Sequence, residues 1–253
     1  MFLRFEQVSL HFSGVAALSA VDLEIPQGGI FAIIGPNGAG KTTLLNCVSR
    51  FYTPQEGRIT FLGRDLLAAR PYDLASLGIA RSFQNVAPFG RMTVEENMLV
   101  GLHHTIHSSA LSQVLRLPGA RAAERQARAQ ARDVMEQLGI LEHSQRYADE
   151  LPYGVQKRLD VGRALVSRPK LLLLDEPAAG MNEQETAELG EWILGLPAIT
   201  GVTIVMVEHD MSLVMGISQR VAVLDFGRLI AVGAPQEVAS DPAVVEAYLG
   251  KED

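Results

Sequence analysis

Apolar and polar residues alternate along the first part of the chain in the pattern of β-strands. The segments FLRFEQVSLHF (2–12) and SAVDLEI (19–25) show this period of two, and GIFAII (29–34) is a continuous apolar run. Alternation places one face of a strand in the core, whereas a continuous run predicts a strand that is buried on both faces. GRITFLGRDL (57–66) carries a further strand signal.

Helical signals dominate the middle of the chain. KTTLLNCVSRFY (41–52) has helical spacing, and the stretch from about Thr93 to Ser144 is mostly helical in composition. The sequence therefore predicts a helical subdomain over approximately residues 88–168.

The order of elements further along favours a parallel sheet. The apolar runs KLLLLD (170–175) and VTIVMVEH (202–209) flank the helix-like segment NEQETAELGEWILGL (182–196). A strand, a helix and a second strand in this order are typical of α/β proteins. Residues 220–250 predict a closing hairpin, with its turn at Asp225 to Gly227, and a short helix. We interpret residues 1–253 as one α/β domain.

Composition narrows the possible partners. The chain has 253 residues, 47% of them hydrophobic, and a net charge of −7. This length is enough for a full core, and the acidic balance argues against a nucleic-acid partner, because phosphate neutralisation needs an excess of Lys and Arg. Cys47 is the only cysteine, which excludes a disulfide framework and suits a reducing, cytoplasmic compartment. The N-terminus lacks a secretory signal pattern, and no run approaches the length of a membrane helix.

The segment GPNGAGKT (35–42) matches the phosphate-binding pattern G-x-x-x-x-G-K-[ST]. It lies between a predicted buried strand and a predicted helix, which is the context that the mechanism requires. Glycines let backbone N–H groups surround an anion, Lys41 reaches the terminal phosphates, and the Thr42 hydroxyl can bind Mg²⁺. Because no guanine-specific NKxD element follows, ATP is favoured over GTP.

Two adjacent carboxylates follow the apolar run of leucines. Asp175 ends the predicted strand, where ligands of open α/β sheets bind, and can hold Mg²⁺. Glu176 comes next and is expected to point to the other side, where it can polarise the water that attacks the γ-phosphate. The alternative is a polar strand end that only caps a loop before Pro177. Gln84 and His209 are further candidates for the metal, water or γ-phosphate, although such residues are often structural.

The segment LPYGVQKRLDVGRAL (151–165) predicts a helix that begins near Val155, after Pro152 and Gly154. Gly154 is expected to allow close approach of another group. A second anion site in one chain can reach the same nucleotide only when another subunit supplies it. The sequence therefore suggests a dimer that encloses ATP.

Together these motifs resemble the ATP-binding subunit of ABC transporters over essentially the whole chain. The resemblance implies an ABC ATPase fold, which combines a P-loop NTPase core, an antiparallel β subdomain and an inserted helical subdomain. It assigns Gln84 to the Q-loop, His209 to the switch and Phe12 to adenine stacking. The residues that it implies for nucleotide binding are Phe12, Gly35, Pro36, Asn37, Gly38, Ala39, Gly40, Lys41, Thr42, Thr43, Tyr153, Gly154, Val155 and Gln156. It further implies Glu176, His209 and Gln84 as catalytic residues and Thr42, Gln84 and Asp175 as metal ligands.

Two departures from the common motifs place the chain within this superfamily. Pro152 and Tyr153 replace the usual Ser and first Gly of the LSGGQ signature, and Asn182 replaces the usual final Asp of the D-loop. These replacements, with MTVEENMLVG and EHDMSLVMGIS, resemble the LivG-type subunits of branched-chain amino acid importers. Pro152 removes one hydroxyl and one N–H, so we expect a functional signature with altered contacts. Tyr153 either packs against a partner or covers the nucleotide.

The resemblance implies an ATPase that drives import through a membrane permease, with branched-chain amino acids as cargo. The implied partners are permease subunits, a second ATP-binding subunit in a homodimer or heterodimer, and, indirectly, a periplasmic binding protein. The implied location is peripheral, on the cytoplasmic face of the inner membrane. Other cargoes (urea, amides, aromatic acids or exported lipopolysaccharide), a non-transport ABC ATPase, and a regulatory module that binds nucleotide without turnover stay open as alternatives.

Weaker features have simpler interpretations. His103, His104 and His107 have the spacing of metal ligands, but an exposed polar segment is the more ordinary reading. Regularly spaced arginines predict a basic helical face that is either solvated or meets an acidic surface; they are Arg121, Arg125, Arg128 and Arg132. The DFG triplet at 225–227 is interpreted as a hairpin turn, and Cys47 as a small buried residue.

Overall fold

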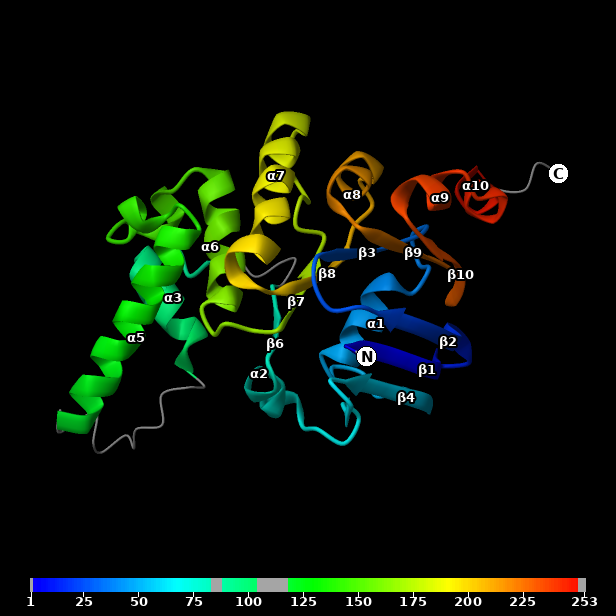
Figure 1. The fold of residues 1–253 in the computed structure, drawn as a ribbon, viewed down its shortest axis with the longest axis horizontal. Helices are drawn as coiled ribbons and strands as arrows, with labels where there is room; N and C mark the ends of the chain where they lie inside the picture. The colour runs from blue at the N-terminus through cyan, green and yellow to red at the C-terminus, as the bar shows by residue number, and fades with distance from the viewer. Residues whose placement is uncertain (1, 83–87, 104–117, 250–253) are drawn as a thin grey trace. The chain divides into compact units, whose positions relative to one another are not determined.

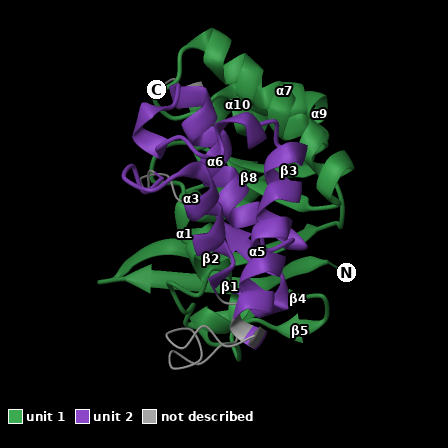
Figure 2. Cartoon of the chain, turned by 90° about the vertical axis from the view of Figure 1, so that its left-hand side faces the viewer, with its two compact units in different colours: residues 1–74, 173–253 green, residues 75–172 purple. Residues whose placement is uncertain are grey.

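The computed structural model describes residues 2–82, 88–103 and 118–249 (Figure 1). The chain divides into two compact units, which Figure 2 shows in different colours. Unit 1 comprises residues 1–74 and 173–253, and unit 2 comprises residues 75–172. The helical subdomain expected at about 88–168 falls within the limits of unit 2.

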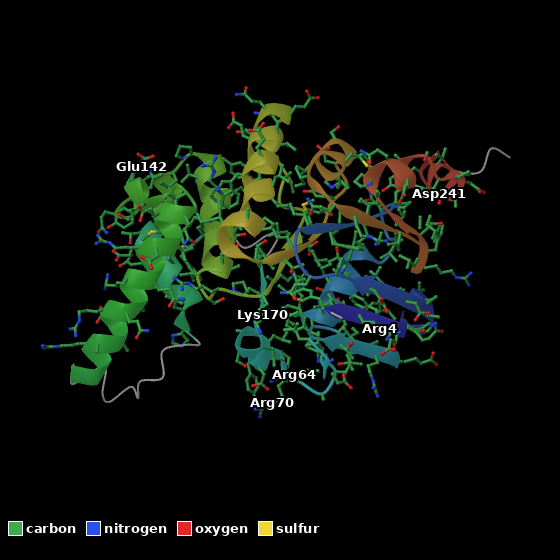
Figure 3. The ribbon with its side chains drawn as sticks, viewed as in Figure 1. Arg4, Arg64, Arg70, Glu142, Lys170 and Asp241 are labelled. Carbon is green, nitrogen blue, oxygen red and sulfur yellow. The ribbon has the colours of Figure 1, made fainter. Side chains whose placement is uncertain are left out.

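An antiparallel sheet forms the first layer of unit 1, with strand order β2-β1-β4-β5. Its strands are β1 (Leu3–Phe12), β2 (Val15–Ile25), β4 (Glu56–Phe61) and β5 (Arg64–Asp65). Leu3 in β1 lies opposite Ile25 in β2 and Phe61 in β4, and all three side chains are buried. The alternation in the sequence thus gives the sheet one apolar face. Charged residues such as Arg64 and Arg70 are exposed instead (Figure 3).

In the second sheet, the strands β3 and β7 lead directly into the predicted phosphate loop and carboxylate pair. Its strand order is β10-β9-β3-β8-β7-β6, where β6 is Ile79–Arg81. β3 pairs in parallel with β8 and β9, whereas β10 pairs antiparallel with β9. Every residue of β3, β7 and β8 is buried, which is typical of a parallel sheet covered on both faces. The strands are β3 (Ile30–Ile34), β7 (Leu171–Asp175), β8 (Thr203–Val207), β9 (Arg220–Asp225) and β10 (Arg228–Gly233).

The helices of unit 1 follow the strand ends. A capping box begins α7, in which the Asn182 side chain accepts from Glu185 N–H and the Glu185 side chain accepts from Asn182 N–H, each at 3.0 Å. Asn is as good a helix cap as Asp, so the departure at Asn182 keeps this helix start intact. The helices are α1 (Lys41–Val48), α7 (Glu183–Thr200), α8 (Met211–Ile217), α9 (Pro235–Ala239) and α10 (Pro242–Leu249). A turn of 3₁₀ helix (Pro71–Asp73) precedes α2 (Leu74–Leu77).

Unit 2 is built mainly from three helices, α3 (Val94–Gly101), α5 (Pro118–Gln137) and α6 (Tyr153–Leu165). Two 3₁₀ turns, Leu141–His143 and Ala148–Glu150, join α5 to α6. Glycine allows these helices to approach closely, because a Cβ on Gly162 would lie 2.8 Å from a methyl group of Leu138. Gly162 therefore has a packing role between α6 and the end of α5.

Most of the predicted elements are present, with one shift. The turn between β9 and β10 falls at Asp225 to Gly227, as predicted. The signature helix begins at Tyr153 rather than near Val155, because Pro152 already has an extended backbone (φ −54°, ψ 147°) that leads directly into the first turn. Among the residues that the structure describes, no helix is long and apolar enough to span a membrane.

Candidate nucleotide site

The phosphate loop joins β3 to α1 and has a backbone that only glycine adopts easily. Gly40 caps the start of α1 with φ 99°, and a Cβ there would lie 2.5 Å from the carbonyl oxygen of Ala17. A Cβ on Gly35 would overlap the carbonyl oxygen of Leu224. Both the positive φ and the close neighbours therefore require glycine at Gly40. Thr42 is exposed on the first turn of α1, and Thr43 is half-buried.

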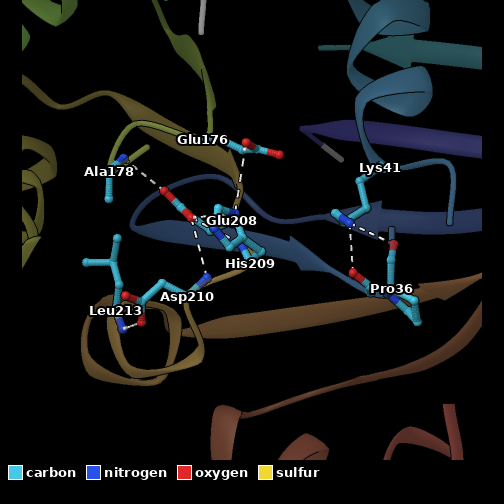
Figure 4. Close-up of polar contacts among 9 residues, drawn as sticks. Pro36, Lys41, Glu176, Ala178, Glu208, His209, Asp210 and Leu213 are labelled. Atoms are coloured by element: carbon cyan, nitrogen blue, oxygen red, sulfur yellow. Dashed lines mark hydrogen bonds and ion pairs between the residues drawn. The ribbon is translucent and has the colours of Figure 1, made fainter. Parts of the chain in front are cut away.

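Lys41 lies across the phosphate loop. Its Nζ donates to the carbonyl oxygens of Gly35, at 2.7 Å, and Pro36, at 2.9 Å (Figure 4). Burial lowers the pKa of the Lys41 ammonium, and the nearby carboxylates Glu176 and Asp175 oppose this shift. The carbonyl oxygens thus hold a buried cation that faces two carboxylates.

The turn between β9 and β10 is hydrogen-bonded to the phosphate loop. Gly227 N–H donates to the carbonyl oxygen of Ala39 at 3.0 Å, and Gly227 accepts from Ser19 N–H at 2.8 Å. Gly227 has φ 77°. The triplet at 225–227 is therefore a turn, as the sequence predicted, and it fixes the loop.

Asp175 and Glu176 separate at the end of β7. Asp175 is the last residue of the strand and is buried, whereas Glu176 has a left-handed backbone with φ 47°. Glu176 N–H donates to the carbonyl oxygen of Val207 in β8 at 2.9 Å. The strand thus ends at Asp175, and the chain turns at Glu176. A left-handed residue other than glycine costs on the order of 1 kcal/mol, and such strain is common at functional sites.

His209 follows β8 and faces Glu176. Its Nδ1 lies 3.9 Å from Glu176 Oε2 and 3.7 Å from Glu208 Oε2 (Figure 4). Glu208, between Val207 and His209, is completely buried and was missed by the sequence reasoning. The sequence feature that could have identified Glu208 is a carboxylate directly after the five residues of a buried strand. The structure thus brings Glu176 and His209 together through the ends of neighbouring strands.

Phe12 is the last residue of β1 and remains 43% exposed, enough to stack on a ligand. The ring of Tyr52 packs edge-on against it, with 4.9 Å between centroids and 71° between ring planes. Sequence reasoning named Phe12 but not Tyr52, which comes from a segment about 40 residues further along the chain.

The signature residues lie in unit 2, at the start of α6. Pro152 is the N-cap and provides no side-chain cap. The Tyr153 ring is 42% exposed, with Lys157 Nζ 5.4 Å from its centroid, and Gln156 donates to the Leu151 carbonyl oxygen at 2.9 Å. A Cβ on Gly154 would meet nothing within 4 Å. The close approach that we expected at Gly154 is therefore not made within the described parts of this chain.

Three of the predicted residues lie outside the described residues; they are Gln84, His104 and His107. Within residues 2–82, 88–103 and 118–249, no cluster of three or more His, Cys, Asp or Glu could hold a metal. Cys47 is buried, and burial raises the pKa of its thiol to about 12.

The basic face on α5 is exposed, and Arg128 pairs with acidic neighbours. Arg128 contacts Glu124 at 3.0 Å and Glu95 at 3.4 Å. The hydrogen bond to Glu124 raises the pKa of this guanidinium. A solvated face that forms ion pairs is the interpretation that these contacts favour.

Comparison with known proteins decides the family. The sequence pattern of the family described as ABC transporter matches residues 18–179, which is more than half of the chain. The chain belongs to the ABC transporter family. The pattern described as branched-chain amino acid ATP-binding cassette transporter also matches residues 228–253. The resemblance inferred from the motifs is therefore confirmed.

Individual relatives agree with this family. The chain is 44% identical to the high-affinity branched-chain amino acid transport ATP-binding protein LivG of Salmonella typhimurium, over 96% of this chain and 95% of the relative. It is 38% identical to the corresponding protein BraF of Pseudomonas aeruginosa, over 96% of each chain.

Solved structures confirm the ABC ATPase fold. A nucleotide-free ATP-binding cassette from an ABC transporter is 33% identical, with a TM-score of 0.85 over 99% of both chains. An ATP-binding cassette in its ADP conformation matches with the same TM-score of 0.85 at 32% identity, again over 99% of both chains. The chain is thus the nucleotide-binding, ATPase component of a transporter.

Proposed function

We propose that this chain hydrolyses ATP to drive an importer of branched-chain amino acids. The observation that carries the proposal is the meeting of Lys41, Glu176 and His209 at one edge of the parallel sheet, within a chain that matches transport ATPases over nearly its whole length. The relatives named for branched-chain amino acid transport, and the match at residues 228–253, support this cargo.

The phosphate loop would bind the triphosphate of ATP. Backbone N–H groups of residues 35–43 and the N-terminus of α1 attract anions, because helix N-termini carry unpaired N–H groups and positive potential. Lys41 would exchange its two carbonyl partners for phosphate oxygens, which interact more strongly with an ammonium. Phe12 would stack on the adenine, with Tyr52 holding its ring at a fixed angle.

The residues near Lys41 fit a magnesium ion. Asp175 supplies a carboxylate at the end of β7, and Thr42 supplies an exposed hydroxyl on α1. Both are oxygen ligands, which Mg²⁺ prefers. When bound, Mg²⁺ would neutralise charge on the phosphates, and we propose Gln84 as a further ligand.

Glu176 would act as the general base. Glu176 follows the end of β7 with a left-handed backbone, so that Asp175 would serve the metal while Glu176 would orient the attacking water. The imidazole of His209, close to Glu176, would hydrogen-bond the γ-phosphate. The chain therefore positions charge and water around the phosphoryl group, which is most of what this reaction needs.

The signature would complete the nucleotide site of another subunit. Gly154 has open space around it and Tyr153 is exposed, as a surface that receives a partner's nucleotide requires. We propose Tyr153, Gly154, Val155 and Gln156 as the contact residues. The partner is a second ATP-binding subunit, either another copy of this chain or a related one.

The remaining partners follow from the proposed transport role. Two permease subunits would bind the ATPase dimer at the cytoplasmic face of the membrane, with the residues around Gln84 as the docking region. A periplasmic binding protein would deliver the amino acid on the other side and would not touch this chain. Substrate selection would therefore belong to other subunits.

The test compares ATP turnover by the assembled transporter containing either wild type or Glu176→Gln. We expect the variant to keep ATP binding and to lose turnover by about 10²–10⁴-fold, the usual contribution of a general base. Glu183→Gln, an exposed residue in the first turn of α7, is the control and should hydrolyse ATP normally. Equal turnover in wild type and Glu176→Gln would contradict the role of Glu176, and stimulation by an amino acid outside the branched-chain class would contradict the cargo.

A further inference from the structure

Glu208 is a buried carboxylate to which the proposed reaction gives no role. It lies directly after β8 and is completely buried. Removing a carboxylate from water is costly unless hydrogen bonds compensate for the lost hydration. An apolar residue would fill this buried position at lower cost. The carboxylate next to His209 therefore has a role other than filling space.

The two oxygens of Glu208 bind two different loops. Oε1 accepts from Ala178 N–H at 3.0 Å, and Oε2 accepts from His209 N–H at 3.0 Å and from Asp210 N–H at 3.5 Å (Figure 4). Ala178 comes two residues after Glu176 in the loop that follows β7. One side chain thus connects the loop behind Glu176 to the loop that carries His209.

A backbone hydrogen bond runs beside this connection. Glu176 N–H donates to the carbonyl oxygen of Val207, the last residue of β8, at 2.9 Å. This bond fixes where Glu176 leaves the sheet, and Glu208 holds Ala178, two residues further along the same loop. The two side chains that these loops carry approach each other, with 3.9 Å between His209 Nδ1 and Glu176 Oε2.

We infer that Glu208 is a positioning residue that holds Glu176 and His209 in register for ATP hydrolysis. The inference rests on the proposed function, because it concerns how the same two groups are aligned. Glu208 accepts from backbone N–H groups of both loops, and its Oε2 also lies 3.7 Å from His209 Nδ1. Both loops must carry their reactive side chains to one phosphoryl group, so a single buried anion that binds both loops couples their positions.

The chemistry of the side chain separates this role from simple space filling. Glutamine has the shape of glutamate but only one oxygen, so it can accept from one loop and must turn its NH₂ group toward the N–H of the other. Glu208→Gln therefore releases one loop while keeping the volume of the core. Thr203→Val is the matched control, because Thr203 begins the same strand and accepts from Gly28 N–H at 2.9 Å, at the end opposite the site.

The experiment measures steady-state ATP hydrolysis by the assembled transporter that contains this chain as wild type, Glu208→Gln, His209→Ala or the double variant. We expect Glu208→Gln to lower kcat by about tenfold to a hundredfold, since small displacements of catalytic groups have effects of this size, with KM for ATP changed by less than about threefold. Adding Glu208→Gln to His209→Ala should have little further effect, because residues that act through one another are not additive. Hydrogen exchange over residues 177–182 should quicken in Glu208→Gln and stay unchanged in Thr203→Val.

Three results would overturn the inference: a wild-type kcat in Glu208→Gln, an equal loss of kcat in Thr203→Val, or full additivity with His209→Ala. If Glu208→Gln does not fold, Glu208→Asp keeps both oxygens but draws them back by one methylene, and the same change in kcat at constant KM is expected. A wild-type assembled transporter that binds ATP without hydrolysing it would instead contradict the proposed function.

Discussion

Two helix starts in this chain each carry a glycine that we expected near the nucleotide, but their surroundings differ. The phosphate loop before α1 is enclosed by its own chain: Gly40 is packed against Ala17, and Lys41 is bonded to two loop carbonyls. The start of α6 has no capping side chain, and in the described parts of the chain a Cβ on Gly154 would meet nothing within 4 Å. Under the proposed function, the first helix start is a complete anion site and the second is a half-site that meets the nucleotide of a partner subunit.

We expect the largest effect, a loss of ATP affinity, from a substitution that disrupts the phosphate loop. Gly40→Ala puts a Cβ where the backbone has φ 99° and where the Ala17 carbonyl oxygen would be 2.5 Å away. The loop must shift, so we expect ATP affinity to fall at least about a hundredfold, or about 2.7 kcal/mol. Titration calorimetry of the single chain measures this loss. Unchanged affinity would show that the loop does not need its observed shape.

The same substitution at the half-site should behave differently. Gly154→Ala meets open space in a helical backbone, so we expect unchanged ATP affinity of the single chain and a free energy of unfolding that rises by about 0.5–1 kcal/mol. Turnover of the assembled dimer should nevertheless fall by about tenfold or more, because the added methyl group faces the partner's nucleotide. Normal turnover in the transporter would argue against a contact at Gly154.

The signature helix also carries a titrating carboxyl. Burial raises the pKa of Asp160 to about 6, although Arg163 contacts it at 2.8 Å and opposes the shift. The folded state therefore holds this proton more tightly than the unfolded state, and the free energy of unfolding falls as the pH rises between about 4 and 6. In Asp160→Asn this part of the pH dependence should vanish, a change on the order of 2 kcal/mol. Urea unfolding of both proteins across this range measures it, and parallel pH profiles would contradict the assignment.

A third helix start, that of α7, has a side-chain cap at Asn182 and serves as the comparison for the other two. Asn182→Ala removes an acceptor for Glu185 N–H, so we expect a loss of about 1 kcal/mol in the free energy of unfolding. Asn182→Asp should change it by only a few tenths of a kcal/mol, because both side chains cap well. Thermal unfolding of the two variants distinguishes these outcomes. Equal destabilisation by both substitutions would mean that the cap contributes little here.

The sequence predicted those features that depend on local patterns. The phosphate loop, the buried strands and the turn at Gly227 are encoded by consecutive residues, so they could be predicted without the fold. The roles of Glu208 and Tyr52 depend on segments that meet only after folding, and a single sequence does not show such pairings. The left-handed backbone of Glu176 was missed because strand alternation was extended one residue too far. The openness around Gly154 likewise depends on what the rest of the chain leaves uncovered.

In the proposed mechanism, ATP joins the complete phosphate site of one subunit to the half-site of a second subunit. Light scattering on Glu176→Gln tests this most directly, with and without Mg-ATP, for the chain alone and mixed with a second ATP-binding subunit of the same transporter. We expect Mg-ATP to double the mass in at least one of these two arrangements, and which one does so distinguishes a homodimer from a heterodimer. A chain that binds Mg-ATP but keeps the mass of a single subunit in both arrangements would rule out the dimer that encloses ATP.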